Sequence, residues 1–488
     1  MALNLVRNSK VFFTTNVDTA ANGYRVKTTG FTPTNTFEIQ VLDGLSFSQN
    51  TNADTVTVSE AGDTPVRGQR SFNTSLAPVD FSFSNYIRPY NTGSAITAEE
   101  SVLWNALLTD AEISTANTIT LGGTVSSAAY AFANGTGTLT ITGTAMTYVG
   151  AAAGDTVVVT GLTGAPAADL PFINAPALIK TISATSITLE YVNPKPGTIT
   201  GITIGGVKFH KSAWAPVNTS YSLVSAAGSN KHQLQKFGLL IVVDQVVYAI
   251  DNCALGQVTI DFGLDAIATA AWTGQGTTMR EVATAATASA GTFGGGTLTG
   301  TYTQKNTAAA YITNKLSTVS LSLVNSLKNS AGATVAAAGT SYALAITGGS
   351  ITINNNITYI TPANLGVVNT PVTYYTGTRA ITGTLNAYLK TGSGVQSTGQ
   401  LLADMLSAAA SSVEPMAALS ISVGGGANPI KAVIEMPAVT LSIPSVDVQQ
   451  VVSTAINFTA QSSVPSNVAD GTVYDLSEIN DVTVKYFA

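Results

Sequence analysis

The chain has 488 residues, of which only 10% are charged and 45% are hydrophobic, and its formal net charge is -6. This length predicts two to four domains, and the acidic balance argues against tight phosphate binding, which needs clustered Lys and Arg. The single cysteine, Cys253, excludes internal disulfides, and neither a signal peptide nor an apolar run of about 20 residues is present, so we expect a soluble chain made in the cytoplasm.

The small residues indicate an all-β protein. Threonine, valine, serine and alanine are abundant, and there are 44 glycines. Threonine and valine suit a pleated sheet, while glycine supplies turns. A large β protein with few charges is prone to edge-to-edge aggregation. A permanent assembly in which strand edges are paired would remove that risk.

The first hundred residues predict a long hairpin. Alternation over Thr36–Asn50 predicts a strand that could bulge at Gly44, followed by a polar loop over Thr51–Arg70. Val79–Tyr90 alternates again, which places Phe81, Phe83 and Asn85 on one face of the second strand and Ser82, Ser84 and Tyr86 on the other.

A helix and three strands are expected next. Thr97 is a suitable N-cap, Glu99 and Glu100 suit a first helical turn, and an apolar stripe follows at Val102, Leu103, Ala106 and Leu107. Further along, Phe237–Gly274 predicts three strands with turns near Asp244 and Asn252.

The last third repeats this order. Ser350–Pro362 predicts a strand interrupted by three asparagines, Arg379–Thr391 predicts its partner, and a helix follows with Ser397 or Thr398 as cap. Its apolar stripe would be Leu401, Leu402, Met405 and Leu406, and closing strands follow. Since Ser46–Val58 is amide-rich like Ser350–Pro362, we interpret the chain as two copies of one module, bent at the same point in each.

The two remaining segments have no counterpart. Ser114–Ala215 reads as an inserted small β domain, a sandwich or barrel of Ig-like size, and the Ala/Thr/Gly-rich stretch after it as a linker. The predicted organisation is a first module at 1–113 and 216–280, an insertion at 114–215, a linker at 281–310, a second module at 311–465 and a C-terminal segment at 466–488.

No catalytic, cofactor-binding or metal-binding residues are predicted. The two histidines, His210 and His232, lie apart from any acidic or nucleophilic cluster, and with one cysteine they cannot form a Cys/His zinc site. Gly294–Gly300 lacks the Lys-Ser/Thr of a phosphate-binding loop. A glycan-cleaving enzyme would need paired carboxylates at a cleft, and no convincing pair is evident. We therefore expect a protein without enzymatic activity or cofactor.

Two sequence blocks resemble a known family. The stretch VSEAGDTPVRGQRSFNTSLAPVDFSFSNYIRPY (58–90), followed by VLWNAL, resembles the major tail tube proteins of long-tailed bacteriophages, in particular the duplicated kind. GGSITINNNITYITP (348–362) is similar to the matching stretch of the second copy. LNLVRNSKVFF near the N-terminus and IDNCALGQVTIDF (250–262) fit as well. The resemblance covers about three quarters of the chain and leaves out the insertion.

The resemblance implies a mainly β fold of two tandem β-sandwich modules, each with a flanking helix. Duplicated relatives form homotrimeric rings that imitate hexamers, and the rings stack into a tube through which genomic DNA leaves the virion. The implied partners are copies of the chain itself, other tail proteins and double-stranded DNA that passes without specific binding, with no membrane. The implied location is the tail of the virion, after synthesis in the host cytoplasm.

Candidate surfaces follow from this picture. Four lumen strands per module would give about 24 strands in a ring, hence a backbone diameter of roughly 48 Å and a bore of roughly 38 Å. The mixed-charge hairpin loop is the candidate for contacts between rings or subunits, and its candidate residues are Glu60, Asp63, Arg67 and Arg70. A loop that is merely solvated is the alternative. The candidates for the lumen or interface face are Glu38, Gln40, Asp43, Asp80, Ser82 and Ser84. The insertion would lie outside the bore.

Two other readings stay open. A baseplate protein or a capsid decoration protein would share the β assembly but not the tube. A bacterial surface adhesin built of β repeats would carry a secretion signal and repeats without a helix in each, unlike this chain.

Overall fold

The structure, a computed structural model, is mainly β. It describes residues 10–32, 34–58, 68–91, 96–108, 118–133, 136–148, 153, 156–166, 169–174, 176–191, 195–210, 214–217, 220–224, 234–243, 246–264, 266–283, 292–293, 296–297, 311–390, 397–411, 415–424, 430–448, 451–461 and 482–487. No helix within these ranges is long and apolar enough to span a bilayer. The helical segments are α1 (Ser101–Leu108), α2 (Leu170–Ile173), α4 (Thr398–Ala408) and the 3-10 turns η2 (Ala20–Asn22) and η4 (Asn314–Leu316).

Most strands belong to one antiparallel network. From the first two thirds of the chain it takes β1 (Lys10–Thr14), β2 (Thr36–Ile39), β3 (Ser46–Val58), β4 (Gly68–Tyr86), β14 (Trp214–Val217), β15 (Ser220–Val224), β16 (Phe237–Val243), β17 (Val246–Gly263), β18 (Thr269–Gly276) and β19 (Thr278–Ala283). From the last third it takes β22 (Thr318–Leu323), β25 (Ser341–Tyr342), β26 (Ala345–Asn354), β29 (Ala380–Tyr388), β30 (Met416–Gly424), β31 (Lys431–Leu441), β32 (Ser445–Asp447), β33 (Ser453–Ala460) and β34 (Thr483–Phe487). Short separate hairpins are β5 (Pro89–Asn91) with β6 (Ile96–Ala98), β20 (Thr292–Phe293) with β21 (Gly296–Thr297), β23 (Leu327–Lys328) with β24 (Thr334–Ala336), and β27 (Ile357–Ile360) with β28 (Thr373–Thr376).

A continuous run of strands crosses the whole network. Its order is β3–β4–β18–β17–β26–β29–β33, with β31 and β32 beside β33. In its centre, Gln257–Gly263 of β17 pairs with Gly348–Asn354 of β26. The run therefore joins strands from the first two thirds of the chain to strands from the last third, and we call it the long sheet.

Strand β17 belongs to two sheets. Its first part pairs with β16 and β19, and its second part pairs with β18 and β26. The transition lies at Asn252, whose φ of 46° is left-handed, as in a bulge that redirects a strand. The turn predicted near Asn252 is therefore wrong: the chain bends there without reversing. The predicted reversal near Asp244 does occur, between Val243 and Val246, although Asp244 itself lies outside the described residues.

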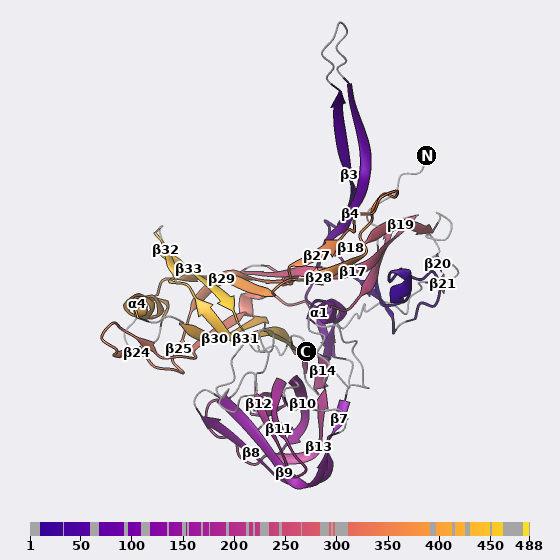
Figure 1. Ribbon diagram of the computed structural model, residues 1–488. Coiled ribbons are helices and arrows are strands. Elements are labelled where there is room, and N and C mark those ends of the chain that lie inside the picture. Colours follow the sequence, from indigo (N-terminus) through magenta and orange to yellow (C-terminus); the bar gives the residue numbers. More distant parts are fainter. Residues whose placement is uncertain are drawn as a thin grey trace.

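The hairpin differs from its prediction in two ways. Thr36–Asn50 is not one strand, because β2 ends at Ile39 and β3 begins at Ser46 after Gly44, which has a φ of 103°. The polar segment predicted as loop is largely strand, since β3 runs on to Val58 and β4 begins at Gly68. The two strands form a ribbon that rises away from the rest of the chain (Figure 1).

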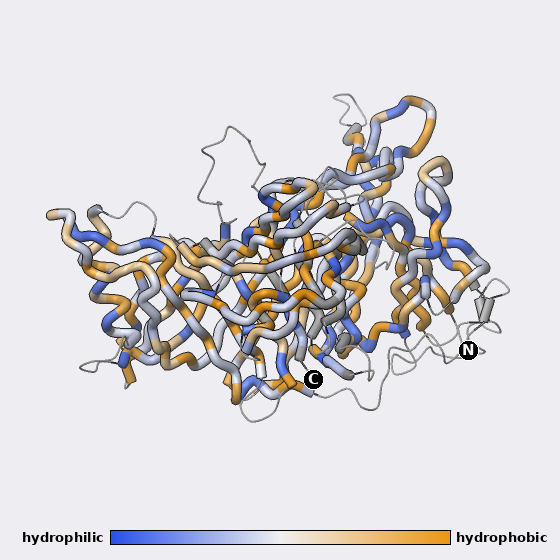
Figure 2. The backbone as a smooth tube through the Cα atoms, turned by 90° about the horizontal axis from the view of Figure 1, so that it is seen from below, coloured by the Kyte–Doolittle hydropathy of each residue, from blue (hydrophilic) through white to orange (hydrophobic). Residues whose placement is uncertain are grey.

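Helix α1 packs against the apolar face of the long sheet. All eight of its residues are buried, and Trp104 meets Trp272 of β18 edge-on at 5.0 Å between ring centroids. The predicted start is wrong: Thr97 lies in β6, and Glu99 and Glu100 precede the helix as buried residues. Figure 2 shows hydrophobic and hydrophilic residues interspersed along the backbone.

Helix α4 begins as predicted. Ser397 is its N-cap and accepts a hydrogen bond from the backbone N–H of Gln400 at 3.4 Å. Leu401 and Met405 of the predicted stripe are buried. Leu406 is 57% exposed, so the helix buries a narrower face than its sequence indicates.

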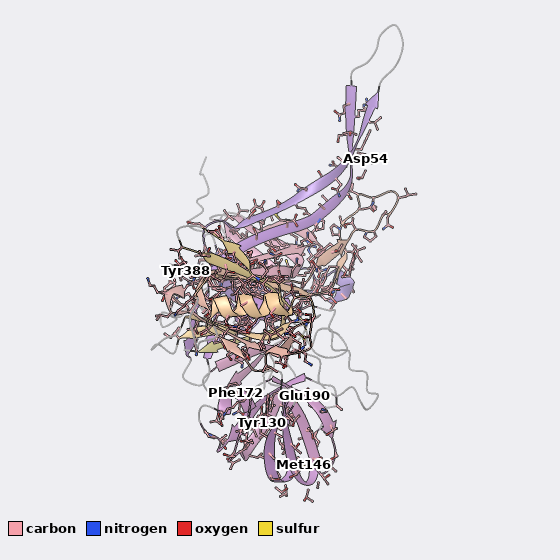
Figure 3. All side chains as sticks on the ribbon, turned by 90° about the vertical axis from the view of Figure 1, so that its left-hand side faces the viewer. Asp54, Tyr130, Met146, Phe172, Glu190 and Tyr388 are labelled. Carbon is pink, nitrogen blue, oxygen red and sulfur yellow. The ribbon has the colours of Figure 1, made fainter. Side chains whose placement is uncertain are left out.

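Residues 118–210 form a separate body with its own hydrophobic core. Its strands are β7 (Thr118–Thr120), β8 (Gly122–Ala133), β9 (Thr136–Thr147), β10 (Thr156–Thr163), β11 (Pro176–Ile182), β12 (Ser186–Tyr191) and β13 (Thr203–His210), in the order β7-β13-β10-β11-β12-β9-β8. Only Leu121 separates β7 from β8, so the two ends of the sheet meet and it closes as a barrel. The barrel and the β3–β4 ribbon lie on opposite sides of the molecule, as Figures 1 and 3 both show.

Candidate functional site: the polar face of the long sheet

One face of the long sheet is lined by hydroxyl and amide side chains. In β4, Val79, Phe81 and Phe83 are buried, whereas Asp80 is exposed and Ser82 and Ser84 are half-buried. The same alternation recurs in every strand of the run, because successive side chains point to opposite faces. The alternation predicted for Phe81, Phe83 and Asn85 against Ser82, Ser84 and Tyr86 is thus confirmed.

Strand register aligns the polar side chains in rows across the sheet. The cross-strand partners follow one another as Ser46, Ser82, Thr273, Gln257 and Asn354 in one row, as Ser84, Ala271, Thr259, Thr352, Thr382 and Thr459 in the next, and as Thr269, Asp261, Ser350, Thr384 and Asn457 in a third. None of these positions holds Lys or Arg. These three rows are therefore hydroxyl-rich, weakly acidic and free of cations.

Hydrogen bonds link cross-strand neighbours on this polar face. Gln275 donates to Asp80 at 2.7 Å, and Thr384 donates to Asn457 at 2.8 Å. The hydroxyls of Thr259 and Thr352 lie 3.1 Å apart across the β17–β26 pairing. A shallow hollow of about 420 Å³ opens here, lined by Ser46, Ser48, Asp80, Phe81, Ser82, Gly256, Gln257, Thr273, Gly274, Gln275, Asn354, Asn356 and Ile357. It holds one carboxylate and no nucleophile with an adjacent base.

The structure separates the predicted lumen candidates into two groups. Asp80, Ser82 and Ser84 lie together on the polar face. Glu38 does not share it, because it lies on β2, which pairs with β1 outside the long sheet. Gln40 accepts a hydrogen bond from Arg88 at 3.0 Å, and Asp43 is exposed in the turn before β3.

The predicted contact loop is only partly described. Glu60, Asp63 and Arg67 lie outside the described residues. Arg70 is exposed on β4 opposite Val56, and Asp54 lies on the projecting ribbon (Figure 3). Val56 and Phe72 on this ribbon are 51% and 54% exposed. A two-stranded ribbon is marginal by itself, and this one exposes apolar side chains and strand edges.

The three consecutive asparagines at the end of β26, Asn354, Asn355 and Asn356, have three separate roles. Asn354 lies in the polar rows. Asn355 is buried and donates to the carbonyl of Leu107 at 2.7 Å. Asn356 is left-handed, with a φ of 48°, and donates to the carbonyl of Thr378 at 2.6 Å. The expected bend therefore falls at 355–356, whereas in β3 the amide-rich stretch gives register shifts between Gln49 and Thr51 and between Asn52 and Ala53.

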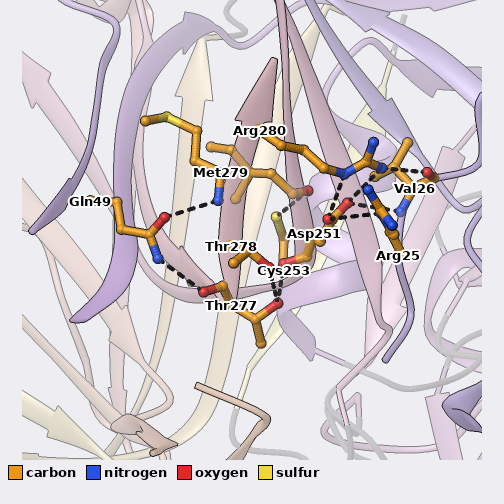
Figure 4. A network of polar contacts seen from close by, with 10 residues as sticks. Arg25, Val26, Gln49, Asp251, Cys253, Thr277, Thr278, Met279 and Arg280 are labelled. Carbon is orange, nitrogen blue, oxygen red and sulfur yellow. Dashed lines mark hydrogen bonds and ion pairs between the residues drawn. The ribbon is translucent and has the colours of Figure 1, made fainter. Parts of the chain in front are cut away.

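A buried carboxylate fixes the N-terminal segment onto β17 (Figure 4). Asp251 accepts hydrogen bonds from the backbone N–H of Val26 at 2.9 Å and from Arg280 Nε at 2.8 Å. Arg280 also donates to the carbonyl of Val26 at 2.6 Å. Since Arg280 lies on β19, the contact joins three distant parts of the chain.

The neighbouring thiol is unsuited to nucleophilic chemistry. Cys253 is fully buried, and burial raises the pKa of its thiol well above the usual value. Reactive cysteines are exposed and have a lowered pKa. Within the described residues, no group of three or more His, Cys, Asp or Glu could hold a metal ion. His232 lies outside those residues, and His210 ends β13.

A second buried acidic cluster holds the C-terminal strand. Tyr486 of β34 donates to Glu100 at 2.7 Å, and both side chains are fully buried. Burial raises the pKa of Glu100 to about 7. Beside it, Glu99 pairs with Arg88 at 3.3 Å. From the sequence, Glu99 and Glu100 were expected in the first turn of the helix. Their burial was not predicted, because it depends on Tyr486, which lies 386 residues further along the chain.

Comparison with known proteins gives one informative relative. No family model matches the chain. The chain is 25% identical over 477 residues to a protein named "Tail tube protein pb6" from Escherichia phage T5. The match covers 96% of this chain and 75% of that protein.

Proposed function

We propose that this chain is a structural protein of a phage tail, whose copies form rings that stack into a tube for the passage of genomic DNA. The observation that carries the proposal is the long sheet, whose polar face runs through both halves of the chain without a Lys or Arg in its rows. A conduit must not grip DNA, and each phosphate contact by a cation strengthens binding through counterion release. The similarity to a phage tail tube protein supports the same role.

The two halves of the long sheet support a duplicated module. The pairings β3–β4, β4–β18 and β18–β17 have counterparts in β26–β29, β29–β33 and β33–β31. Each half also pairs one phenylalanine with one glycine on the buried face, Phe81 with Gly274 in the first and Phe458 with Gly383 in the second. Between the two halves, the phenylalanine and the glycine have exchanged strands, while the cross-strand pair itself is kept. We therefore assign residues 1–113 with 216–280, and residues 311–465, to two modules joined by 281–310.

The edges of the long sheet support ring closure. Among the described residues, β3 pairs only with β4, and β32 only with β33. Pairing β32 of one copy with β3 of the next would repeat the β17–β26 contact. The end of β31 and β32 both pair with β33 and count as one strand of the barrel. Each copy would then supply eight strands, so three copies would supply about 24 and close a barrel of roughly 48 Å backbone diameter. Three copies of a single module would give a barrel of only half that diameter. Because each chain carries two modules, three chains are enough, and we propose a homotrimer.

The barrel formed by residues 118–210 would lie on the outside of this tube. Helix α1 covers the apolar face of the long sheet, and the barrel begins at Thr118, shortly after α1 ends. The returning strand β15 pairs with β34, whose Tyr486 is bonded to Glu100 before α1. The insertion thus leaves from the side of the sheet that faces away from the polar rows, and it does not block the bore.

Electron microscopy of the assembled protein tests the proposal. End-on averages should show a hollow ring with a sixfold-like inner wall and three outer protrusions, and the mass of a ring should equal three chains. Solid particles or monomers would contradict the tube and favour another structural role in the virion.

A further inference from the structure

The long sheet has two ends, defined by its register. Near the ribbon, Asn354 of β26 lies opposite Gln257, and the segment 361–372 between β27 and β28 follows; we call this the near end. At the far end Gly348 lies opposite Gly263, and the turn after β17 follows. The turn between β32 and β33 is at the far end too, because Ser453 lies opposite Tyr388, and Tyr388 opposite Ala345.

The near end carries an apolar knob. Leu365 is 103% exposed, Val367 is 64% exposed and Val368 is 51% exposed. No charged residue occurs from Ser350 to Thr378. Neighbouring large apolar side chains this exposed are typical of an interaction site rather than of a free surface.

The knob is held in place against the ribbon. The backbone N–H of Asn369 donates to the carbonyl of Thr74 at 3.2 Å, and its carbonyl accepts from the N–H of Leu76 at 2.8 Å. Its side-chain oxygen accepts from the N–H of Asn364 at 2.8 Å, which closes the segment on itself. A segment fixed in this way loses little conformational entropy when it docks.

The far end carries exposed apolar residues as well. Leu264, after β17, is 49% exposed, and Val448 and Val451, between β32 and β33, are 78% and 60% exposed. The same chain therefore has apolar groups at both ends of one sheet. Two different patches on one molecule that fit each other form a head-to-tail contact, which does not close and builds a stack.

We infer that Leu365, Val367 and Val368 dock on the far end of a second copy of this chain, against Leu264, Val448 and Val451 in the adjacent ring. This inference rests on the proposed tube and adds a contact to it that is separate from the β3–β4 ribbon. The uncharged knob makes the contact apolar, so it tolerates high salt, unlike an interface of ion pairs.

The test compares Leu365→Ser with Leu406→Ser, since Leu406 is an exposed leucine on α4 that belongs to neither apolar patch. Ring mass is measured by native mass spectrometry and tube length by electron microscopy. Leu365→Ser should keep the mass of the wild-type ring, while the mean tube length falls by at least about tenfold. Leu406→Ser should match the wild type in both.

The outcomes separate the inference from the proposed function. Tubes of Leu365→Ser as long as those of the wild type would overturn the knob contact and leave the tube standing. Absence of rings and tubes from the wild-type protein would overturn both. Val448→Ser, at the opposite end of the contact, should shorten the tubes like Leu365→Ser, and wild-type length for this variant would contradict the pairing of the two ends.

Discussion

The side-chain amide of Asn355 donates a hydrogen bond of 2.7 Å to the carbonyl oxygen of Leu107, 248 residues earlier, in the last turn of helix α1. Arg379 donates to the next carbonyl, that of Leu108, at 3.2 Å and to Asn355 Oδ1 at 3.1 Å. The last carbonyls of a helix have no partner within it. Two side chains from the last third of the chain therefore complete a helix of the first third.

Asn355→Ala should lower the free energy of unfolding by about 1–3 kcal/mol, because a buried helix carbonyl loses its donor. Urea unfolding measures this change. Asn386→Ala is the matched control, since Asn386 is exposed on the polar face, and its effect should stay within about 0.5 kcal/mol. Equal effects of the two variants would contradict a capping role for Asn355.

Glu100 should make stability fall as pH rises. Its pKa is about 7 in the folded protein against 4.5 ordinarily, so the folded state binds the proton more tightly than the unfolded state. The free energy of unfolding therefore falls as the pH rises from 4.5 to 7, by up to about 3 kcal/mol. Above pH 7 that cost is fully present.

Glu100→Gln removes the titration and should reduce the loss of stability between pH 5 and pH 8, as measured by urea unfolding at both values. Gln can still accept the hydrogen bond of Tyr486. Glu38→Gln, at a partly exposed position, should leave the pH dependence as it is. The same slope for Glu100→Gln and the wild type would rule out this assignment.

Cations on the polar face should convert the conduit into a DNA-binding surface. Tubes that carry both Thr273→Lys and Thr384→Lys should retain short fluorescent duplex DNA at low salt and release it as salt rises, because each phosphate contact releases counterions. Ala403→Lys, at an exposed position of α4, is the charge-matched control. Equal retention by both variants would show that these rows do not face passing DNA.

The phenylalanine–glycine pairs predict a rescue. Phe81→Gly should cost about 4 kcal/mol of stability, because it leaves a cavity and a flexible strand residue. A Cβ at Gly274 would lie 2.4 Å from the Phe81 ring, so Gly274→Phe alone should also destabilise the protein. The double variant copies the arrangement of Gly383 with Phe458 and should be more stable than either single variant. Additive losses in thermal unfolding would argue against equivalence of the two sites.

Local sequence pattern was sufficient for part of this structure. The alternation of Phe81 and Phe83 with Ser82 and Ser84 predicted the two faces of β4, and the Ser397 cap predicted the start of α4. These features depend on side-chain period and on one nearby hydrogen bond, both of which are local.

Features that depend on distant partners were not predicted correctly. Asn252 suits a turn by itself, but its N–H donates to the carbonyl of Tyr24 and its carbonyl accepts from Tyr359, so it forms a bulge within β17. Glu100 suits a helix start, but Tyr486 from the C-terminal strand buries it. The pairing of β17 with β26 leaves no local signal, because its residues are nearly a hundred positions apart.

The most direct measurement tests whether the sheet continues from one copy to the next. Ser445 lies opposite Ala455 as Thr259 lies opposite Ala271, and Ser48 lies opposite Asp80 as Thr352 lies opposite Thr382. Because Thr259 pairs with Thr352 inside the chain, Ser445 should meet Ser48 of the neighbouring copy. The only native cysteine, Cys253, is buried, so it should contribute little background to disulfide cross-linking between introduced cysteines.

Assembled protein with Ser445→Cys and Ser48→Cys should form a disulfide-linked species of three chains on non-reducing gels after mild oxidation. Ser445→Cys with Asp54→Cys, about 20 Å further along β3, should stay monomeric under the same conditions. A covalent trimer for the first pair alone is the result that the account predicts. Monomers for both pairs in assembled material, or equal cross-linking of both, would contradict the continuous ring.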